Sequence, residues 1–185
     1  MKDRPIIFSG AMVRAILDGT KTQTRRVIRL GRGVSILGDG NLAQRDDHRC
    51  PYGEPGDRLW VKETHQIRQR VIGSRLTART ETWVNYRADA ENVERWRPSI
   101  YMPRWASRIT LELTDVRVQR VQSISEEDAR AEGAPALAEG VDDAAAFGLR
   151  HTVGFARLWD SINLDRAPWA ANPWVWALTF KRVTP

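Results

Sequence analysis

The sequence predicts an α+β fold, in which single helices flank a small mixed sheet or barrel. Apolar and polar residues alternate in several short segments, as they do in half-buried strands, and apolar residues recur at helical spacing in others. These segments do not follow a regular strand–helix–strand order, which argues against a doubly wound parallel sheet. At 185 residues the chain has the length of one domain, so we expect a single domain over 1–185.

The helices are predicted from their apolar spacing and their end residues. Ser9 is a favourable N-cap and Gly19 a favourable terminator, so a helix is expected over about 10–18. Ser125 begins a capping box, and Gly133 ends the two-turn helix that follows it. A third helix is expected at "TVGFARLWDSI", whose apolar side chains share one face: Phe155, Leu158, Trp159 and Ile162.

The strands are predicted from period-two alternation and from the turns that bound it. They are expected at 58–64, at 81–89, in "SRITLELTDVRVQRV" with a kink near Asp115, and in the closing "NPWVWALTFKRV". The segment 28–56 is rich in glycine and polar residues, so we expect a loop there with at most one short strand. The inward positions of the strands give a predicted core: Leu59, Val61, Ile109, Leu111, Leu113, Leu178 and Phe180.

The composition is typical of a soluble globular protein, with 42% hydrophobic and 28% charged residues. No segment approaches the ~20 consecutive apolar residues that cross a membrane, and the N-terminal apolar run is too short for a signal peptide. The single cysteine, Cys50, excludes an internal disulfide and fits a reducing compartment. We therefore expect a cytoplasmic protein that does not bind a membrane.

Metal-binding and cofactor-binding motifs are absent from the sequence. His48 lies two residues before Cys50, but one such pair is too little for a zinc site. His65 and His151 have no motif around them, and the chain has no glycine-rich phosphate loop. We expect neither a metal nor a cofactor.

The charge balance favours a phosphate-bearing partner. The chain has 29 Lys and Arg against 23 Asp and Glu, a net charge of +6, and a pI near 10.1. Such a charge attracts nucleic acid, although a merely solvated basic surface has the same composition. The cations concentrate in "LDGTKTQTRRV", which contains Lys21, Arg25 and Arg26. Like charges repel at this spacing, so either the segment is solvated or an anionic or polar group docks there.

Three residues are candidates for acid–base or nucleophilic chemistry. Glu132 ends the capped helix, where the macrodipole disfavours an anion, and Asp128 adds a like charge one turn earlier. Lys21 is flanked by two arginines, which lower the pKa of its ammonium group and make it a candidate base. Thr24 becomes a nucleophile if that base reaches its hydroxyl, which requires a turn or bulge between them. The alternative is that Lys21 and Glu132 are solvent-facing residues without chemistry.

A second group of cations surrounds an aromatic residue just before the clearest strand. In "SIYMPRWASRI", Arg104 and Arg108 flank Trp105. Guanidinium groups and an indole ring together suit base stacking and phosphate contact. The alternative is a core tryptophan with arginine stems packed around it.

Several segments together resemble the ASCH domain, named for activating signal cointegrator homology, of the PUA-like superfamily. They are "PIIFSGAMVRAILDGTKTQTRRV", "PGDRLWVKET", "MPRWASRITLELTDVRV", "ISEEDARAEG" and "NPWVWALTF". The resemblance covers most of the chain in the same order and leaves insertions at about 31–50, 65–80 and 134–150. It is closest to members found in bacteria and their phages. It implies a PUA-like small mixed β-barrel with flanking helices and a cleft beside the barrel.

The resemblance also implies functions. ASCH domains are regarded as modules that bind RNA or modified nucleotides, some members are reported ribonucleases, and one bacterial member hydrolyses N4-acetylcytidine. Its catalytic lysine, threonine and glutamate correspond to Lys21, Thr24 and Glu132. Further contacts to substrate or nucleic acid are expected from the cations and aromatic residues of the quoted motifs: Thr22, Arg25, Arg26, Trp60, Arg104, Trp105 and Arg108.

Three functions therefore compete at the level of sequence. The first is binding of RNA or a modified nucleoside in a basic cleft. The second is hydrolysis, either of an N-acylated pyrimidine nucleoside or of RNA, and it requires Lys21, Thr24 and Glu132 to converge. The third is a phage or host interaction protein without chemistry. The sequence leaves the oligomeric state, the base and the choice between RNA and DNA open.

Overall fold

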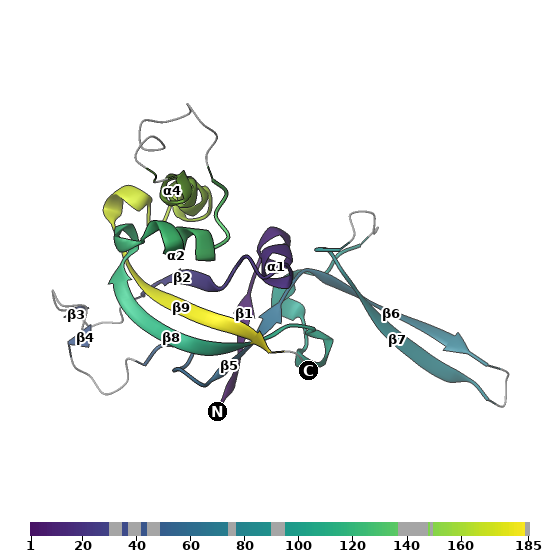
Figure 1. The fold of residues 1–185 in the computed structure, drawn as a ribbon. Coiled ribbons are helices and arrows are strands. Elements are labelled where there is room, and N and C mark those ends of the chain that lie inside the picture. Colours follow the sequence, from purple (N-terminus) through teal and green to yellow (C-terminus); the bar gives the residue numbers. More distant parts are fainter. Residues whose placement is uncertain are drawn as a thin grey trace.

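The computed structural model describes residues 1–29, 35–36, 42–43, 49–73, 77–89, 95–136, 148 and 150–183. Its centre is a five-stranded mixed sheet with helices packed around it, and a two-stranded arm projects from this body (Figure 1). The predicted α+β class is confirmed. The strands of the sheet are β1 (Asp3–Ile7), β2 (Gln23–Val27), β5 (Arg58–Lys62), β8 (Thr110–Arg120) and β9 (Trp174–Val183).

The sheet is curled but not closed into the expected barrel. Its strand order is β1-β5-β8-β9-β2, in which β1 and β5 are parallel and the other neighbours antiparallel. The two edge strands form no ladder with each other in the described part of the chain. A side chain joins them instead, because the Arg26 guanidinium donates to the carbonyl oxygen of Ile7 at 2.6 Å.

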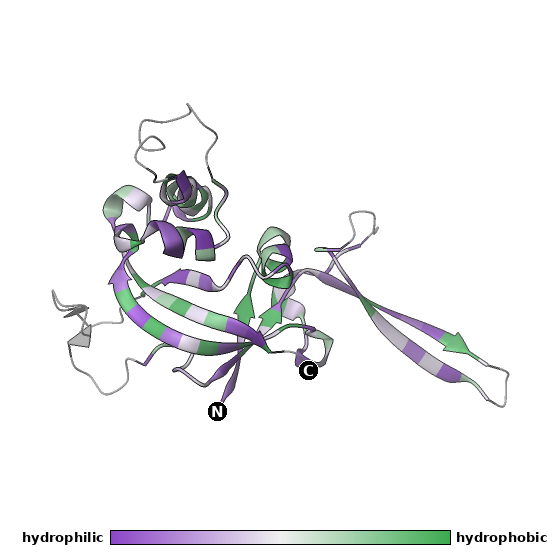
Figure 2. Ribbon diagram, viewed as in Figure 1, coloured by the Kyte–Doolittle hydropathy of each residue, from purple (hydrophilic) through white to green (hydrophobic). Residues whose placement is uncertain are grey.

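The predicted kink in the longest strand is a β-bulge. The pairing of β8 with β9 shifts its register between Leu113 and Asp115, where one extra residue enters β8. Figure 2 shows apolar and polar residues alternating along β8 and β9, as expected for strands with one buried face. All seven predicted core residues are at most 3% exposed: Leu59, Val61, Ile109, Leu111, Leu113, Leu178 and Phe180.

The three predicted helices are present as α1 (Gly10–Leu17), α2 (Glu126–Ala131) and α4 (Arg150–Asn163). The hydroxyls of Ser9 and Ser125 accept backbone N–H groups and cap α1 and α2 as predicted. The prediction for the apolar face of α4 is wrong in part, because Ile162 is 59% exposed. Phe155 and Trp159 are buried in a second, smaller core, together with Val121, Ile124, Ala129, Ala134 and Val175.

The arm consists of β6 (His65–Ile72) and β7 (Arg79–Tyr86), which pair in antiparallel fashion along their whole length. The strand expected at 81–89 corresponds to β7, and the insertion expected at 65–80 contains β6. Strands β1 and β2 were not predicted. The loop expected over 28–56 holds two very short paired strands, β3 (Ser35–Ile36) and β4 (Leu42–Ala43), and most of the insertion expected at 134–150 lies outside the described residues.

Short 3₁₀ turns connect these elements: η1 (Ser99–Tyr101), η2 (Arg104–Ala106), η3 (Val121–Ser123) and η4 (Trp169–Ala171). In the described part of the chain, every helix is too short or too polar to cross a membrane. The helices thus serve to cover the curled sheet and to close its ends.

Packing of α4 against the segment that follows α2 depends on Gly154. A Gly→Ala substitution inside a helix normally stabilises it by about 1 kcal/mol. At Gly154 a Cβ would overlap the backbone carbonyl oxygen of Pro135. We therefore predict that Gly154→Ala lowers the free energy of unfolding, by about 1–3 kcal/mol, as measured in urea. The control is Gly10→Ala in α1, whose Cβ would lie 3.8 Å from its nearest neighbours. Equal effects of the two substitutions would contradict this packing.

Candidate functional site

The site is built on β2, the edge strand that follows the basic segment. Because side chains alternate along a strand, Gln23 and Arg25 point to one face and Thr24 and Arg26 to the other. The first face meets α2, and Arg26 on the second face lines a cavity at the end of the strand. The cations that looked crowded in the sequence are therefore divided between two environments.

Lys21 lies in a buried ion pair with Glu132. Its Nζ is 2.7 Å from Glu132 Oε2 and also donates to the carbonyl oxygens of Gln23 and Glu132, at 2.7 and 2.8 Å. An ammonium group has three protons, and these three acceptors use all of them. The Lys21 side chain is 1% exposed.

Arg25 shares the same carboxylate from the neighbouring position. Its guanidinium donates to Glu132 Oε1 at 3.2 Å and to Asp128 Oδ2 at 2.7 Å, and it lies 5.8 Å from the ring centre of Phe155. Gln23 completes the network by donating to Asp128 Oδ1 at 2.8 Å. We call these five residues the β2–α2 network: Lys21, Gln23, Arg25, Asp128 and Glu132.

The network explains why a glutamate ends α2. Glu132 is the C-cap residue, at the negative end of the helix dipole, and it is only 6% exposed. Two cations, Arg25 of β2 and Lys21 just before it, outweigh that unfavourable position. Burial lowers the pKa of Lys21 below its ordinary value, while Glu132 raises it in return and Arg26 and Arg25 lower it.

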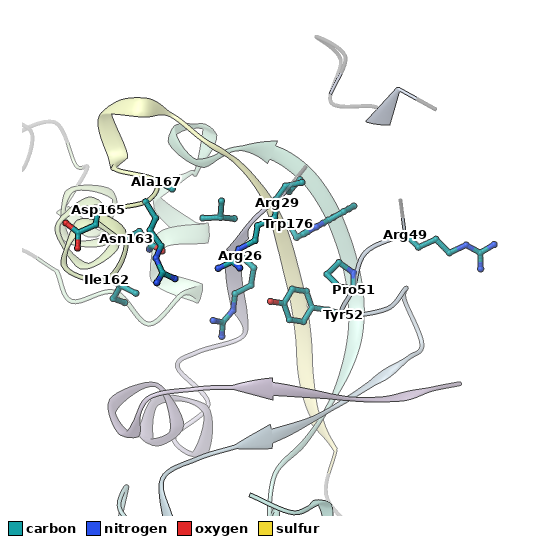
Figure 3. Close-up of a pocket in the computed structure, with 13 residues that line it drawn as sticks. Arg26, Arg29, Arg49, Pro51, Tyr52, Ile162, Asn163, Asp165, Ala167 and Trp176 are labelled. Atoms are coloured by element: carbon teal, nitrogen blue, oxygen red, sulfur yellow. The ribbon is translucent and has the colours of Figure 1, made fainter. Parts of the chain in front are cut away.

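A cavity of about 1290 Å³ opens at the end of β2, where Arg26, Val27, Ile28 and Arg29 line it. Figure 3 shows Arg26 with Ile162 and Asn163 of α4 and the following Asp165 on one side and with Tyr52 on the other. The floor includes Trp176 of β9, which is paired with Arg26 across the ladder.

The cavity is strongly basic. Four arginines from three parts of the chain line it, and one carboxylate opposes them: Arg26, Arg29, Arg49, Arg166 and Asp165. Arg26 is held in place by its hydrogen bond to Ile7 and by the ring of Phe8, whose centre lies 5.2 Å from the guanidinium carbon. The Arg26 Nε is buried and has no hydrogen-bond partner in the described structure.

The three proposed catalytic residues do not line this cavity. Lys21 and Glu132 meet in the network, whereas Thr24 is 3% exposed and its hydroxyl makes no hydrogen bond to either of them among the described residues. Thr22 is exposed, and its backbone joins α2 and β9 by bonds to Ala131 and Phe180.

Arg25 and Arg108, which were expected to contact nucleic acid, each pair with carboxylates of the chain. The Arg25 side chain has no exposed surface, because α2 covers it. Arg108 donates to Glu63 Oε1 at 2.9 Å and to Asp89 Oδ1 at 2.9 Å, and these two carboxylates raise its pKa against the effect of burial. Its guanidinium carbon lies 4.0 Å from the ring centre of Tyr86. Both arginines hold the fold together.

The remaining expected contacts lie on β5 and η2, away from the cavity. Arg104 sits over the ring of Trp60 at 5.8 Å and pairs with Asp3 at 3.3 Å. Lys62 also approaches Trp60, at 5.5 Å, and Trp105 is 63% exposed. These residues form a separate aromatic surface on the outer side of β5.

Sequence reasoning missed most of the cavity. Arg29, Arg49, Tyr52 and Arg166 come from segments that share no motif, and only the fold brings them together. Of the residues that line the cavity, the sequence pointed only to Arg26, which belongs to the basic segment. Among the described residues, no group of three or more His, Cys, Asp or Glu side chains is placed to hold a metal ion.

Comparisons with known proteins give distant likenesses. No protein-family model matches the chain, and no curated protein matches it significantly. A protein from Enterococcus faecalis V583 described under the family DUF984 is 11% identical with a TM-score of 0.46, over 99% of this chain and 80% of that one. An ASCH domain from Lactobacillus crispatus JV V101 is 14% identical with a TM-score of 0.39, over 98% and 79%. The latter bears the family name that the sequence motifs suggested, but at such TM-scores the function must be argued from this chain's own residues.

The β2–α2 network predicts a large effect of removing its shared charge. Glu132→Gln leaves two cations buried without this anion, so we expect the free energy of unfolding to fall by about 3–5 kcal/mol in urea titrations. Lys21→Met should lower the free energy of unfolding less in the Glu132→Gln variant than in the wild type, because the two side chains interact directly.

The control is the exposed pair of Lys181 and Glu112, whose side chains are 61% and 30% exposed. Glu112→Gln should change the free energy of unfolding by at most about 1 kcal/mol. If Glu132→Gln has no larger effect than Glu112→Gln, the network does not stabilise the fold as described.

Proposed function

We propose that this protein binds single-stranded nucleic acid, RNA in the first place, in the basic cavity beside β2. The observation that carries the proposal is the lining of that cavity, where four arginines face one aspartate. A concentration of guanidinium groups in a hollow attracts phosphates and contacts them through two hydrogen bonds at once.

The size and the aromatic residues of the cavity favour a strand over a single small molecule. Its volume of about 1290 Å³ exceeds the range of about 300–1,000 Å³ that drug-sized ligands fill. Tyr52 is half-buried on its wall and offers a ring on which a base can stack. Stacking on an aromatic ring between phosphate contacts is how proteins hold unpaired strands.

The test is the salt dependence of binding to a labelled single-stranded RNA, measured by fluorescence anisotropy. Each phosphate contact contributes about 0.7 to the slope of log affinity against log salt. Replacing Arg29, Arg49 and Arg166 by Gln should therefore reduce the slope by about 2 and weaken binding at low salt. Tyr52→Ala should weaken binding by about 1–3 kcal/mol and leave the salt slope unchanged.

A matched control removes the same charge elsewhere. The variant carries Arg130→Gln, Lys181→Gln and Arg182→Gln, three exposed cations that do not line the cavity. It should keep nearly the wild-type affinity and slope. An equal loss in both variants would mean that only the net charge matters, and a wild-type protein that binds no RNA at low salt would overturn the proposal.

A second candidate function is hydrolysis of an N-acylated pyrimidine nucleoside such as N4-acetylcytidine. The observation in its favour is a buried lysine with a lowered pKa that touches a carboxylate. In this mechanism Lys21 passes a proton to Glu132 and then accepts the proton of Thr24. The Thr24 oxygen attacks the acyl carbon, and Glu132 protonates the departing amine. Water then cleaves the acyl-threonine ester. Because Thr24 is 3% exposed, this reaction requires the edge of β2 to open.

The test is the release of cytidine from N4-acetylcytidine, followed by chromatography. We expect Thr24→Val, which keeps the side-chain shape but removes the hydroxyl, to abolish release, and Thr24→Ser to retain it. Lys21→Ala and Glu132→Ala should also abolish it. Release that survives these substitutions, or its absence in the wild type, would exclude the hydrolase and leave the binding function unaffected.

A further inference from the structure

The arm formed by β6 and β7 contributes no residue to the lining of the cavity, and its length needs a separate explanation. Each strand has eight residues, so at about 3.3 Å per residue the ribbon extends roughly 26 Å. Figure 1 shows it projecting from the body on the side of α1 away from α4. A two-stranded ribbon by itself is only marginally stable in water, so a chain that keeps one this long has to anchor it.

The base of the arm is firmly anchored. His65 is fully buried and pairs with Arg97 through two backbone hydrogen bonds, of 3.2 and 2.8 Å. Opposite it, the Tyr86 hydroxyl donates to the carbonyl oxygen of Ala106 at 2.9 Å, and Arg108 stacks on the Tyr86 ring. The arm is therefore held in one direction relative to the sheet.

The two faces of the arm differ in charge. The ladder pairs Arg68 with Trp83, Arg70 with Glu81, and Ile72 with Arg79, so all three arginines of the two strands share one face with the single glutamate. The other face carries no charge beyond its buried base: Ile67, Gln69, Val71, Thr80, Thr82 and Val84. Charged residues on either face would keep the arm solvated, so solvation alone does not explain why they all lie on one face.

The charged face also has an ordered aromatic residue. The Arg70 guanidinium pairs with Glu81 at 2.8 Å and lies 5.7 Å from the ring centre of Trp83, which is 38% exposed. Glu81 thus positions one arginine against the ring, while Arg79 is 3.9 Å from Glu81 and its side chain is 76% exposed. Arg68 is exposed at the neighbouring position.

We propose that the arginine face of the arm binds the phosphate backbone of the same nucleic-acid strand that the cavity holds, so that long strands contact both sites. Charge complementarity supports this partner, since three guanidinium groups lie on one face of the ribbon with an aromatic ring among them. The proposal rests on the proposed binding function, and it adds that affinity depends on the length of the strand.

The experiment compares single-stranded RNAs of two lengths. About 5 nucleotides span roughly 17 Å at 3.4 Å per nucleotide, and about 20 nucleotides span roughly 68 Å, more than twice the length of the arm. We expect Arg68→Gln with Arg79→Gln to weaken binding of the long RNA at least tenfold at low salt and to reduce its salt slope by about 1.4. Binding of the short RNA should stay at the wild-type level.

Two controls separate the arm from its surroundings. Arg130→Gln with Arg182→Gln removes the same charge from the body, and Gln69→Ala with Thr82→Ala changes the uncharged face of the arm. Both variants should bind the long RNA as the wild type does. Circular dichroism and thermal melting should match the wild type in all variants, because the substituted side chains are exposed.

The outcomes distinguish the two proposals. If the short RNA binds but the arm variant binds the long RNA normally, the arm proposal is wrong and the cavity proposal stands. If neither RNA binds the wild type, both are wrong. If the uncharged-face variant instead changes the molar mass in light scattering, the arm joins two copies of the chain, and that result also overturns the proposal.

Discussion

The fold around the site depends on one buried carboxylate shared by two cations. Glu132 accepts from Lys21 and from Arg25, and so it ties the edge strand β2 to the end of α2. Phe8 of the main core lies beside Lys21, and Phe155 of the smaller core lies beside Arg25, at 5.8 Å in each case. The ion pairs therefore occupy the boundary between two apolar cores. Breaking such a pair leaves an unpaired buried charge, which is why it fixes the position of β2 so strongly.

Fixing β2 also decides which cations face outward. With Arg25 paired to α2, the alternation of the strand sends Arg26 to the opposite face, and Arg26 lines the cavity. Arg26 in turn spans the open seam of the curled sheet by its bond to Ile7. One part of the basic segment is thus buried in ion pairs and another part lines the cavity, so the cations that are adjacent in the sequence are separated once the strand forms.

The sequence allowed the locally determined parts of the fold to be predicted. Ser9 and Ser125 cap their helices through neighbouring backbone groups, and Leu111 and Leu113 alternate within one strand, so short-range patterns sufficed. Strand β2 was missed because its sequence "QTRRV" is polar, and its Arg25 is buried by partners 103 and 107 residues away. Arg25 and Arg26 look equivalent in sequence, and only tertiary structure separates them. The cavity residue Tyr52 had no signal, because its neighbours come from distant segments.

The central claim is that the cavity beside β2, and not the aromatic surface around Trp105, is where nucleic acid binds. Photocrosslinking of a short single-stranded RNA that carries 4-thiouridine, followed by mass spectrometry of the digested protein, tests it most directly. The account predicts crosslinks to the peptides that hold Tyr52 and residues 162–167, and their loss when Arg29, Arg49 and Arg166 are replaced by Gln. Crosslinks confined to residues 99–106, unchanged in that variant, would contradict it.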